Sequence, residues 1–148
     1  FFGYLAEHPE TRRKLVDEPD ATAAMIEEML RWETPVMGCA RVATRSTEID
    51  GFEISAGEQV MGLLGAANVD EAEFTNAGEL VWDRDANRHL AFGGGIHRCL
   101  GSHLARLELR IALREWHRRI PDYSIKPGAE LNYTAGIRTL DGFPMLIG

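Results

Sequence analysis

The segment of residues 92–101 constrains this chain most, because it places one cysteine in a glycine-rich loop directly before a long helical pattern. Glycine adopts positive φ values and has no side chain, so the loop can bring its backbone close to a flat or bulky group. Free N–H groups at a helix start favour a thiolate over a thiol and can tune a metal–sulfur bond. Cys99 is therefore predicted to be a thiolate ligand or a thiolate nucleophile.

Three other interpretations of Cys99 compete with a role as a cofactor ligand. It could be a buried structural cysteine beside a glycine turn, or a nucleophile that uses His97 or His103 as its base. A zinc site could take up to three ligands from His97, Cys99 and His103. A closed zinc site usually contains a CxxC pair, and the sequence has none.

The overall composition excludes several classes of protein. A net charge of −7 makes nucleic acid an unsuitable partner, because phosphate binding needs an excess of Lys and Arg. No apolar run reaches the length of about eighteen residues that a membrane span needs. Cys39 and Cys99 are too few for a disulfide framework, which favours a cytoplasmic protein. The chain starts at Phe1 inside a helical pattern, so it is expected to be a fragment of a longer protein.

Helical periodicity is clear in several segments. Asp20 is the expected N-cap of a helix that Pro35 stops, and Pro121 stops the last helix. That last helix carries an apolar stripe of Leu100, Leu104, Leu107 and Ile111. Helices are predicted over the following residues, with the first interrupted at Pro9: 4–16, 20–32, 66–74 and 100–119.

Short alternating patterns predict strands between the helices and at the end of the chain. Asp50 and Gly51 form a strong hairpin-turn signal. Residues 75–90 have weak periodicity and are predicted to be an irregular meander. The fold class is therefore mainly α with small antiparallel β-sheets, in one partial domain over residues 1–148. The predicted strands are residues 41–44, 47–49, 52–54, 59–64, 123–126, 131–133 and 143–147.

The cysteine loop resembles the haem loop of the cytochrome P450 family, which has Phe, two residues, Gly, three residues, Cys, one residue and Gly. The residues at these four fixed positions are Phe92, Gly95, Cys99 and Gly101. The form common in bacterial soluble members is also matched by His97, Leu100, Leu104, Ala105, Arg106 and Glu108. The resemblance runs from residue 5 to the final hairpin, and it implies the C-terminal portion of the P450 fold.

A second motif lies upstream, where Glu28 and Arg31 have the ExxR form. On a helix this spacing puts both side chains on one face, and an isolated pair of this kind is usually exposed and weak. In the family the motif precedes a small sheet, a meander and the cysteine loop, and this chain has the same order. The resemblance implies a buried structural triad of Glu28, Arg31 and Arg84 behind the haem.

The resemblance also implies how the cofactor, haem b, is held. Cys99 would be the axial ligand of the iron, and no further catalytic residue is assigned, because the oxygen-activating helix of the family lies upstream of Phe1. Arg41 and His97 would pair with the haem propionates, although outside this family Arg41 would be an ordinary surface arginine. The residues assigned to cofactor binding are Cys99, Arg41, His97, Phe92, Gly93, Gly95, Leu100 and Ala105.

The implied reaction is that of a monooxygenase, an oxidoreductase that inserts one oxygen atom from O2 into a hydrophobic organic substrate. A thiolate opposite bound oxygen pushes electron density toward it and favours cleavage of the O–O bond. Electrons would come from NAD(P)H through a redox partner such as a ferredoxin. The isolated fragment is expected to bind haem poorly and to be inactive. A haem-binding gas sensor, and a zinc or cysteine-hydrolase domain, are the alternative classes.

Contacts with substrate and redox partner are predicted from position alone. The arginine stripe, defined as Arg106, Arg110, Arg114 and Arg118, recurs every four residues and could dock an acidic ferredoxin or be an ordinary solvated face. Arg138 could bind a polar end of the substrate or simply be solvated. By resemblance, the substrate-lining residues are Val36, Met37, Gly38, Cys39, Ile137, Arg138, Thr139 and Leu140.

Overall fold

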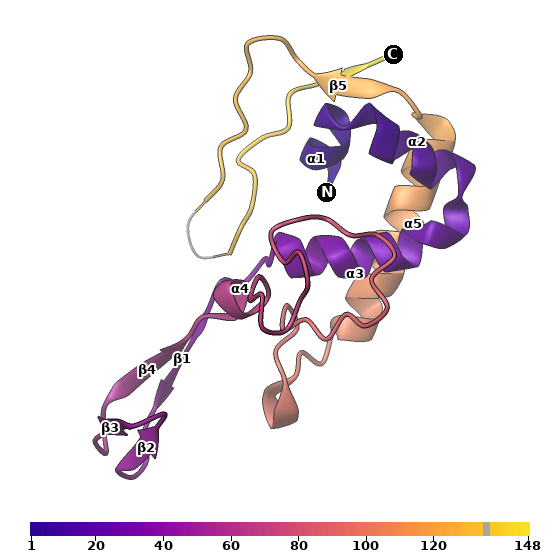
Figure 1. Ribbon diagram of the computed structural model, residues 1–148. Helices are drawn as coiled ribbons and strands as arrows, with labels where there is room; N and C mark the ends of the chain where they lie inside the picture. Colours follow the sequence, from indigo (N-terminus) through magenta and orange to yellow (C-terminus); the bar gives the residue numbers. More distant parts are fainter. Residues whose placement is uncertain (135–136) are drawn as a thin grey trace.

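The computed structural model describes residues 1–134 and 137–148, and it has the predicted fold class of helices with small antiparallel sheets (Figure 1). Helix α3 (Thr22–Trp32) lies near the centre and contacts the long helix α5 (Ser102–Arg119). Helices α1 (Phe2–Glu7) and α2 (Pro9–Asp17) are separated at His8, because Pro9 occupies the first turn of α2 and has no N–H to continue α1. The predicted interruption is confirmed.

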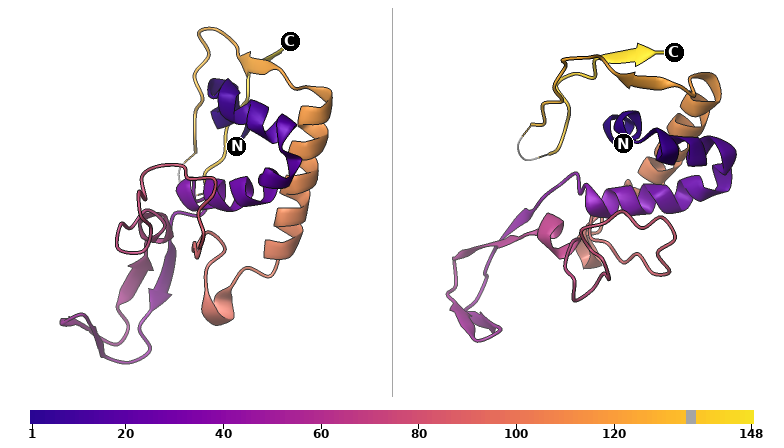
Figure 2. Two further views of the ribbon diagram at one scale, coloured as in Figure 1. Left: turned by 45° about the vertical axis from the view of Figure 1, so that its right-hand side comes forward. Right: turned by 45° about the horizontal axis from the view of Figure 1, so that its top comes forward.

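The core forms where α1, α2, α3 and α5 meet the C-terminal strands. β5 (Tyr123–Ile125) pairs antiparallel with β6 (Met145–Ile147), and both views of Figure 2 place this pair close to α1. Burial of this apolar surface is the main force that holds the elements together. The most buried hydrophobic side chains of this core are Leu5, Leu15, Met25, Ile26, Met29, Leu30, Leu113 and Tyr123.

The remaining strands form a ribbon that extends away from the helices (Figure 1). β1 (Cys39–Val42) pairs with β4 (Gln59–Gly62), and β2 (Thr47–Ile49) pairs with β3 (Phe52–Ile54). Asp50 and Gly51 have φ values of 50° and 80°, so the predicted hairpin turn is confirmed.

Several predicted boundaries are wrong. The helix that was expected over residues 66–74 is α4 (Leu64–Ala67), and turns follow it. Asp20 is not an N-cap, because Pro19 starts a 3-10 helix (Pro19–Ala21) that contains Asp20, and Ala21 is the N-cap of α3. Residues 131–133 form only an isolated bridge from Tyr133 to Leu140. The meander after α4 has no regular element up to the 3-10 helix η2 (Gly95–His97), as predicted for residues 75–90.

Helix α5 differs from its prediction in start and in orientation. It begins at Ser102, two residues after the predicted start. The apolar stripe that predicted the helix is exposed at Leu100, Leu104, Leu107 and Ile111, whereas Ser102, Leu113 and His117 are buried against the other helices. Among the residues that the structure describes, no helix is both long enough and apolar enough to cross a membrane.

Candidate functional site

The cysteine loop is shaped by two glycines and two backbone hydrogen bonds. Gly93 and Gly95 have φ values of +67° and +61°, a region that residues with a side chain rarely adopt. The Gly93 N–H donates to the Leu90 carbonyl at 2.8 Å, and the Cys99 N–H donates to the Phe92 carbonyl at 2.8 Å. These bonds close the loop between residues 92 and 99, so that Cys99 lies just before α5 with an exposed side chain.

The surface around Cys99 suits a flat, apolar cofactor. Ile96 and Leu100 are 97% and 99% exposed, which is unusual for two aliphatic side chains in one short loop. A Cβ added to Gly101 would lie 3.9 Å from the Cys99 sulfur, so the backbone there is open beside the thiol. A thiol between exposed apolar side chains offers both an iron ligand and a hydrophobic contact surface, and these residues fit a haem.

Helix N–H groups were expected to point at the sulfur, and this stays a prediction. The N–H group of Ser102, the first residue of α5, donates to the Cys99 carbonyl at 3.3 Å. The free N–H groups of α5 begin after Gly101, its N-cap. The zinc interpretation lacks geometric support, because the described residues contain no cluster of three or more His, Cys, Asp or Glu that could hold a metal ion.

The ExxR pair forms the centre of a buried charge network. Glu28 and Arg31 are 1% and 0% exposed, and the Arg31 guanidinium donates to both Glu28 carboxylate oxygens at 2.9 and 2.8 Å. Arg84 Nε donates to Glu28 at 3.2 Å, so the structure brings the three residues of the predicted triad together. The Val81 N–H and the Asn87 amide donate to the same carboxylate at 2.8 and 2.9 Å.

Arg31 also fixes the meander. It donates to the carbonyls of Asn68, Ala77 and Glu79 at 2.7, 2.8 and 2.8 Å. The fully buried side chain of Asn68 accepts the Leu90 N–H at 2.6 Å, which extends the network to the start of the cysteine loop. No role was predicted for Asn68 or Asn87, because Asn68 lies in a segment expected to be helix and a single asparagine in the meander carries no signal of its own.

The network predicts a specific acid sensitivity. Burial raises the pKa of Glu28, but hydrogen bonds from Arg31, Arg84 and the Val81 N–H outweigh burial and lower that pKa from 4.5 to about 2. A lowered folded-state pKa gives stability that is complete above pH 4.5 and is lost as the pH falls toward about 2. We expect Glu28→Gln to flatten this part of the stability–pH curve of the full-length protein, measured by chemical unfolding. An unchanged acid slope in this variant would contradict the assignment.

The arginine stripe is only partly free. Arg106 donates to both oxygens of Glu27 at 2.6 and 2.7 Å, so its charge is already paired. Arg118 pairs with Glu115 at 3.0 Å, and Arg114 lies 3.5 Å from the same carboxylate. The structure therefore does not show four free cations in the arginine stripe.

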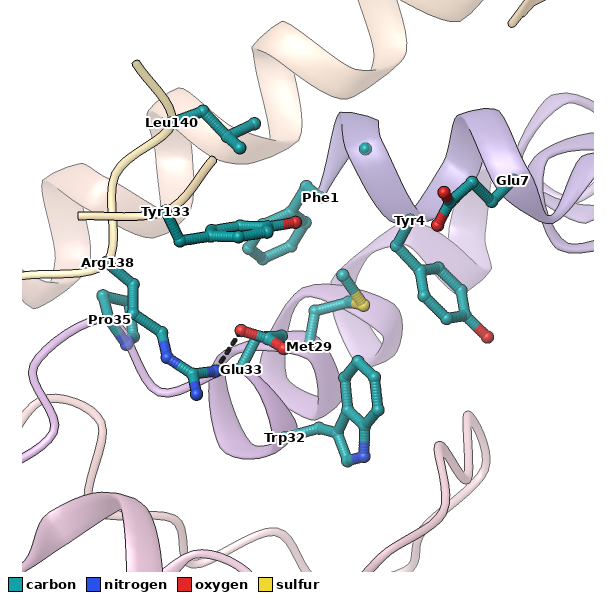
Figure 3. A pocket seen from close by; sticks show the side chains of 11 residues that line it. Phe1, Tyr4, Glu7, Met29, Trp32, Glu33, Pro35, Tyr133, Arg138 and Leu140 are labelled. Carbon is teal, nitrogen blue, oxygen red and sulfur yellow. Dashed lines mark hydrogen bonds and ion pairs between the residues drawn. The ribbon is translucent and has the colours of Figure 1, made fainter. Parts of the chain in front are cut away.

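The predicted substrate-lining segments meet at an antiparallel bridge between Val36 and Ile137. Arg138 donates its N–H to the Pro35 carbonyl at 2.8 Å, and its guanidinium forms an ion pair with Glu33, so it is not simply solvated. Arg138 and Leu140 line a cavity of about 330 Å³ with residues of α1 and α3 (Figure 3). Met37, Gly38, Cys39 and Thr139 lie on the adjoining segments outside this cavity.

The two predicted propionate partners lie on separate elements. Arg41 is exposed on β1, where its guanidinium donates to the Ala40 carbonyl at 2.8 Å. His97 is exposed at the end of η2. Of the remaining predicted cofactor contacts, Phe92 and Ala105 are half-buried.

Comparison with known proteins gives a consistent family. The family model for cytochrome P450 matches residues 1–116. The chain is 43% identical over 143 residues to the biotin biosynthesis cytochrome P450 of Bacillus subtilis, covering 95% of this chain and 36% of the relative. It is 39% identical to the mycinamicin IV hydroxylase/epoxidase of Micromonospora griseorubida, covering 93% of this chain and 35% of that protein.

Solved structures agree with these relatives. The structure of P450BioI in complex with acyl carrier protein ligated to hexadec-9Z-enoic acid has a TM-score of 0.90 and 42% identity, covering 97% of this chain and 38% of that chain. That of CYP109E1 from Bacillus megaterium in complex with testosterone has a TM-score of 0.90 and 32% identity, covering 97% and 40%. The chain thus spans about a third of the length of its curated relatives. On the family model, the relatives and the fold, this chain belongs to the cytochrome P450 family.

Proposed function

We propose that this chain is the haem-binding part of a cytochrome P450 monooxygenase that inserts one oxygen atom from O2 into a hydrophobic organic substrate. The carrying observation is the exposed Cys99 between exposed apolar side chains, on a loop that directly follows a segment tied to a buried charge network. Relatives named as a hydroxylase/epoxidase and as steroid C26-monooxygenases support an oxidoreductase of this class. We further propose that residues 1–148 are one partial domain of a cytoplasmic protein.

The residues would share the work of holding haem b, which supplies the oxygen chemistry when it is bound. Cys99 would bind the haem iron through its thiolate. Arg41 and His97 would supply the positive charge and the donors that partly buried propionates require. Apolar and backbone contact with the macrocycle would come from the other predicted residues, namely Phe92, Gly93, Gly95, Leu100 and Ala105.

Substrate and electron donor would approach from different sides. The Val36–Ile137 bridge joins two exposed, mostly apolar segments, and we assign Val36, Met37, Gly38, Cys39, Ile137, Arg138, Thr139 and Leu140 to the substrate side. Electrons from NAD(P)H would arrive through a ferredoxin or a similar donor. Arg110, Arg114 and Arg118 are the exposed members of the arginine stripe, and Arg110 and Arg114 would face such an acidic partner.

The carbon monoxide difference spectrum of the reduced full-length protein tests this function. A strongly red-shifted Soret band is expected, because thiolate ligation changes the electronic structure of the iron. Substrate-dependent NAD(P)H consumption should accompany it. A red-shifted band without such consumption would indicate a gas sensor, and the absence of any haem spectrum would favour a zinc or hydrolase domain. Either result would refute the monooxygenase.

The isolated chain should bind haem far more weakly than the full-length protein. Leu104, Leu107 and Ile111 are exposed on α5 beside the site. In the isolated chain the surroundings of the cofactor would therefore be open to water. We expect residues 1–148 to lose haem during gel filtration while the full-length protein keeps it, as measured by the ratio of Soret to protein absorbance. Equal retention by both proteins would contradict this expectation.

A further inference from the structure

Directly before Glu28, a second carboxylate on α3 makes a separate set of contacts. Glu27 accepts two hydrogen bonds from Arg106 of α5, from Nε at 2.6 Å and from Nη2 at 2.7 Å. Glu27 Oε2 also lies 3.0 Å from Nε2 of His89, whose side chain is almost fully buried. A bidentate pair of this kind has a defined geometry and is stronger than a single contact between exposed charges. Glu27 therefore joins α3, α5 and the end of the meander.

Both partners of Glu27 lie against Phe92, the first residue of the cysteine loop. The guanidinium carbon of Arg106 is 4.6 Å from the centre of the Phe92 ring, within the range of a cation–π contact. The His89 ring is 6.1 Å from the same ring, and its Nδ1 accepts the Ala91 N–H at 3.2 Å. The half-buried Phe92 side chain is thus held by two groups whose positions Glu27 determines.

Phe92 connects these contacts to the proposed iron ligand. Its carbonyl accepts the Cys99 N–H at 2.8 Å, which closes the loop. The Glu28 network makes no hydrogen bond to any residue from 92 to 101 among the described residues, since its partners lie on α3 and on the meander. Instead, Arg106 and His89 contact the cysteine loop at Phe92. We define Glu27, His89, Arg106 and Phe92 as the Glu27 clamp.

The clamp can stay charged under ordinary conditions. Burial raises the pKa of Glu27, but hydrogen bonds from His89 and Arg106 outweigh burial and lower that pKa from 4.5 to about 2. The hydrogen bonds between Arg106 and Glu27 raise the pKa of Arg106. At neutral pH the carboxylate therefore holds the guanidinium over the Phe92 ring.

We infer that the Glu27 clamp positions the Cys99 thiolate. It does so by fixing the ring of Phe92, whose carbonyl accepts the hydrogen bond from the Cys99 N–H. This inference rests on the proposed haem-thiolate function. It makes Glu27 and Arg106 positioning residues, which do not touch the cofactor but set the geometry of the residue that binds it. Without Glu27, the Arg106 guanidinium would turn toward solvent, and the loop would lose one side of its support.

The experiment uses the full-length protein and the lifetime of its red-shifted carbon monoxide band. Glu27→Gln keeps the size of the side chain and removes its charge. We expect this variant to lose the red-shifted band about tenfold faster than wild type, since a hydrogen-bonded charge pair of this kind changes an equilibrium by about that factor. Glu115→Gln is the matched control, because Glu115 pairs with Arg118 and Arg119 on α5 and makes no hydrogen bond to the cysteine loop. The control should keep the wild-type lifetime.

Two further variants separate positioning from other roles. Arg106→Lys keeps the charge but loses the bidentate geometry, so we expect a band lifetime between those of wild type and Glu27→Gln. This variant still tests the clamp if Glu27→Gln folds poorly. The double variant Glu27→Gln/Arg106→Gln should be no worse than the single variants, because both changes remove one interaction. If Glu27→Gln and Arg106→Lys both keep the wild-type lifetime of the red-shifted band, the clamp is refuted. A change only in the salt dependence of reduction by the electron donor would not support it. A wild-type protein with no red-shifted band would instead refute the proposed function.

Discussion

Cys99→Ser in the full-length protein is expected to abolish the red-shifted carbon monoxide band and substrate-dependent NAD(P)H consumption completely. A serine hydroxyl stays protonated at neutral pH, so it cannot supply the anionic sulfur that thiolate ligation requires. The exposed position of Cys99 also means that the substitution removes no core packing, so the variant should fold normally. The measurement is the difference spectrum together with the circular dichroism of the same sample.

Cys39→Ser provides the matched control for this prediction. Cys39 is the other cysteine of the chain, and it lies half-buried at the start of β1. We expect its substitution to leave the red-shifted band in place, because the proposed iron ligand is Cys99. If Cys99→Ser kept the wild-type band while Cys39→Ser lost it, the assignment of the ligand would be wrong.

The second large effect is expected from Arg31→Met, which should lower the free energy of unfolding by about 3–5 kcal/mol. The substitution removes the main partner of the buried Glu28 carboxylate, and it leaves the carbonyls of Asn68, Ala77 and Glu79 without their donor. A buried charge or acceptor without a partner is more costly than the pair is favourable. Urea unfolding of the full-length protein measures the effect.

Arg114→Met tests whether burial is the cause. The Arg114 side chain is 64% exposed and makes only a 3.5 Å contact with Glu115. Such pairs contribute little to stability, so we expect a change within about 0.5 kcal/mol. A loss for Arg31→Met that is no larger than the loss for Arg114→Met would show that the network does not hold the fold together.

The chemistry-bearing motifs could be predicted from the sequence because each is local. The spacing of Glu28 and Arg31 determines that both side chains lie on one face of α3, whatever surrounds the helix. The glycines of the cysteine loop likewise allow positive φ, and the structure has it at Gly93 and Gly95. Arg84 could be assigned only through the resemblance to the family, since 56 positions separate it from Glu28.

The rest of the site depends on contacts between distant positions. Arg106 and Glu27 are 79 positions apart, so no local pattern reveals that Arg106 is paired instead of free. The apolar stripe of α5 predicted the helix correctly, but the buried face is the one with Leu113 and His117. Periodicity shows that a helix has two kinds of face, whereas the packing of neighbouring elements decides which one is covered.

The three carbonyls that Arg31 binds have a consequence for slow opening motions. Segments without helix or strand usually exchange their amide hydrogens rapidly, because they open independently of the core. Here the backbone around Asn68, Ala77 and Glu79 is tied to a guanidinium that is itself fully buried in α3. An irregular segment and a central helix would therefore unfold as one cooperative unit, and their deuterium uptake would follow the same opening free energy.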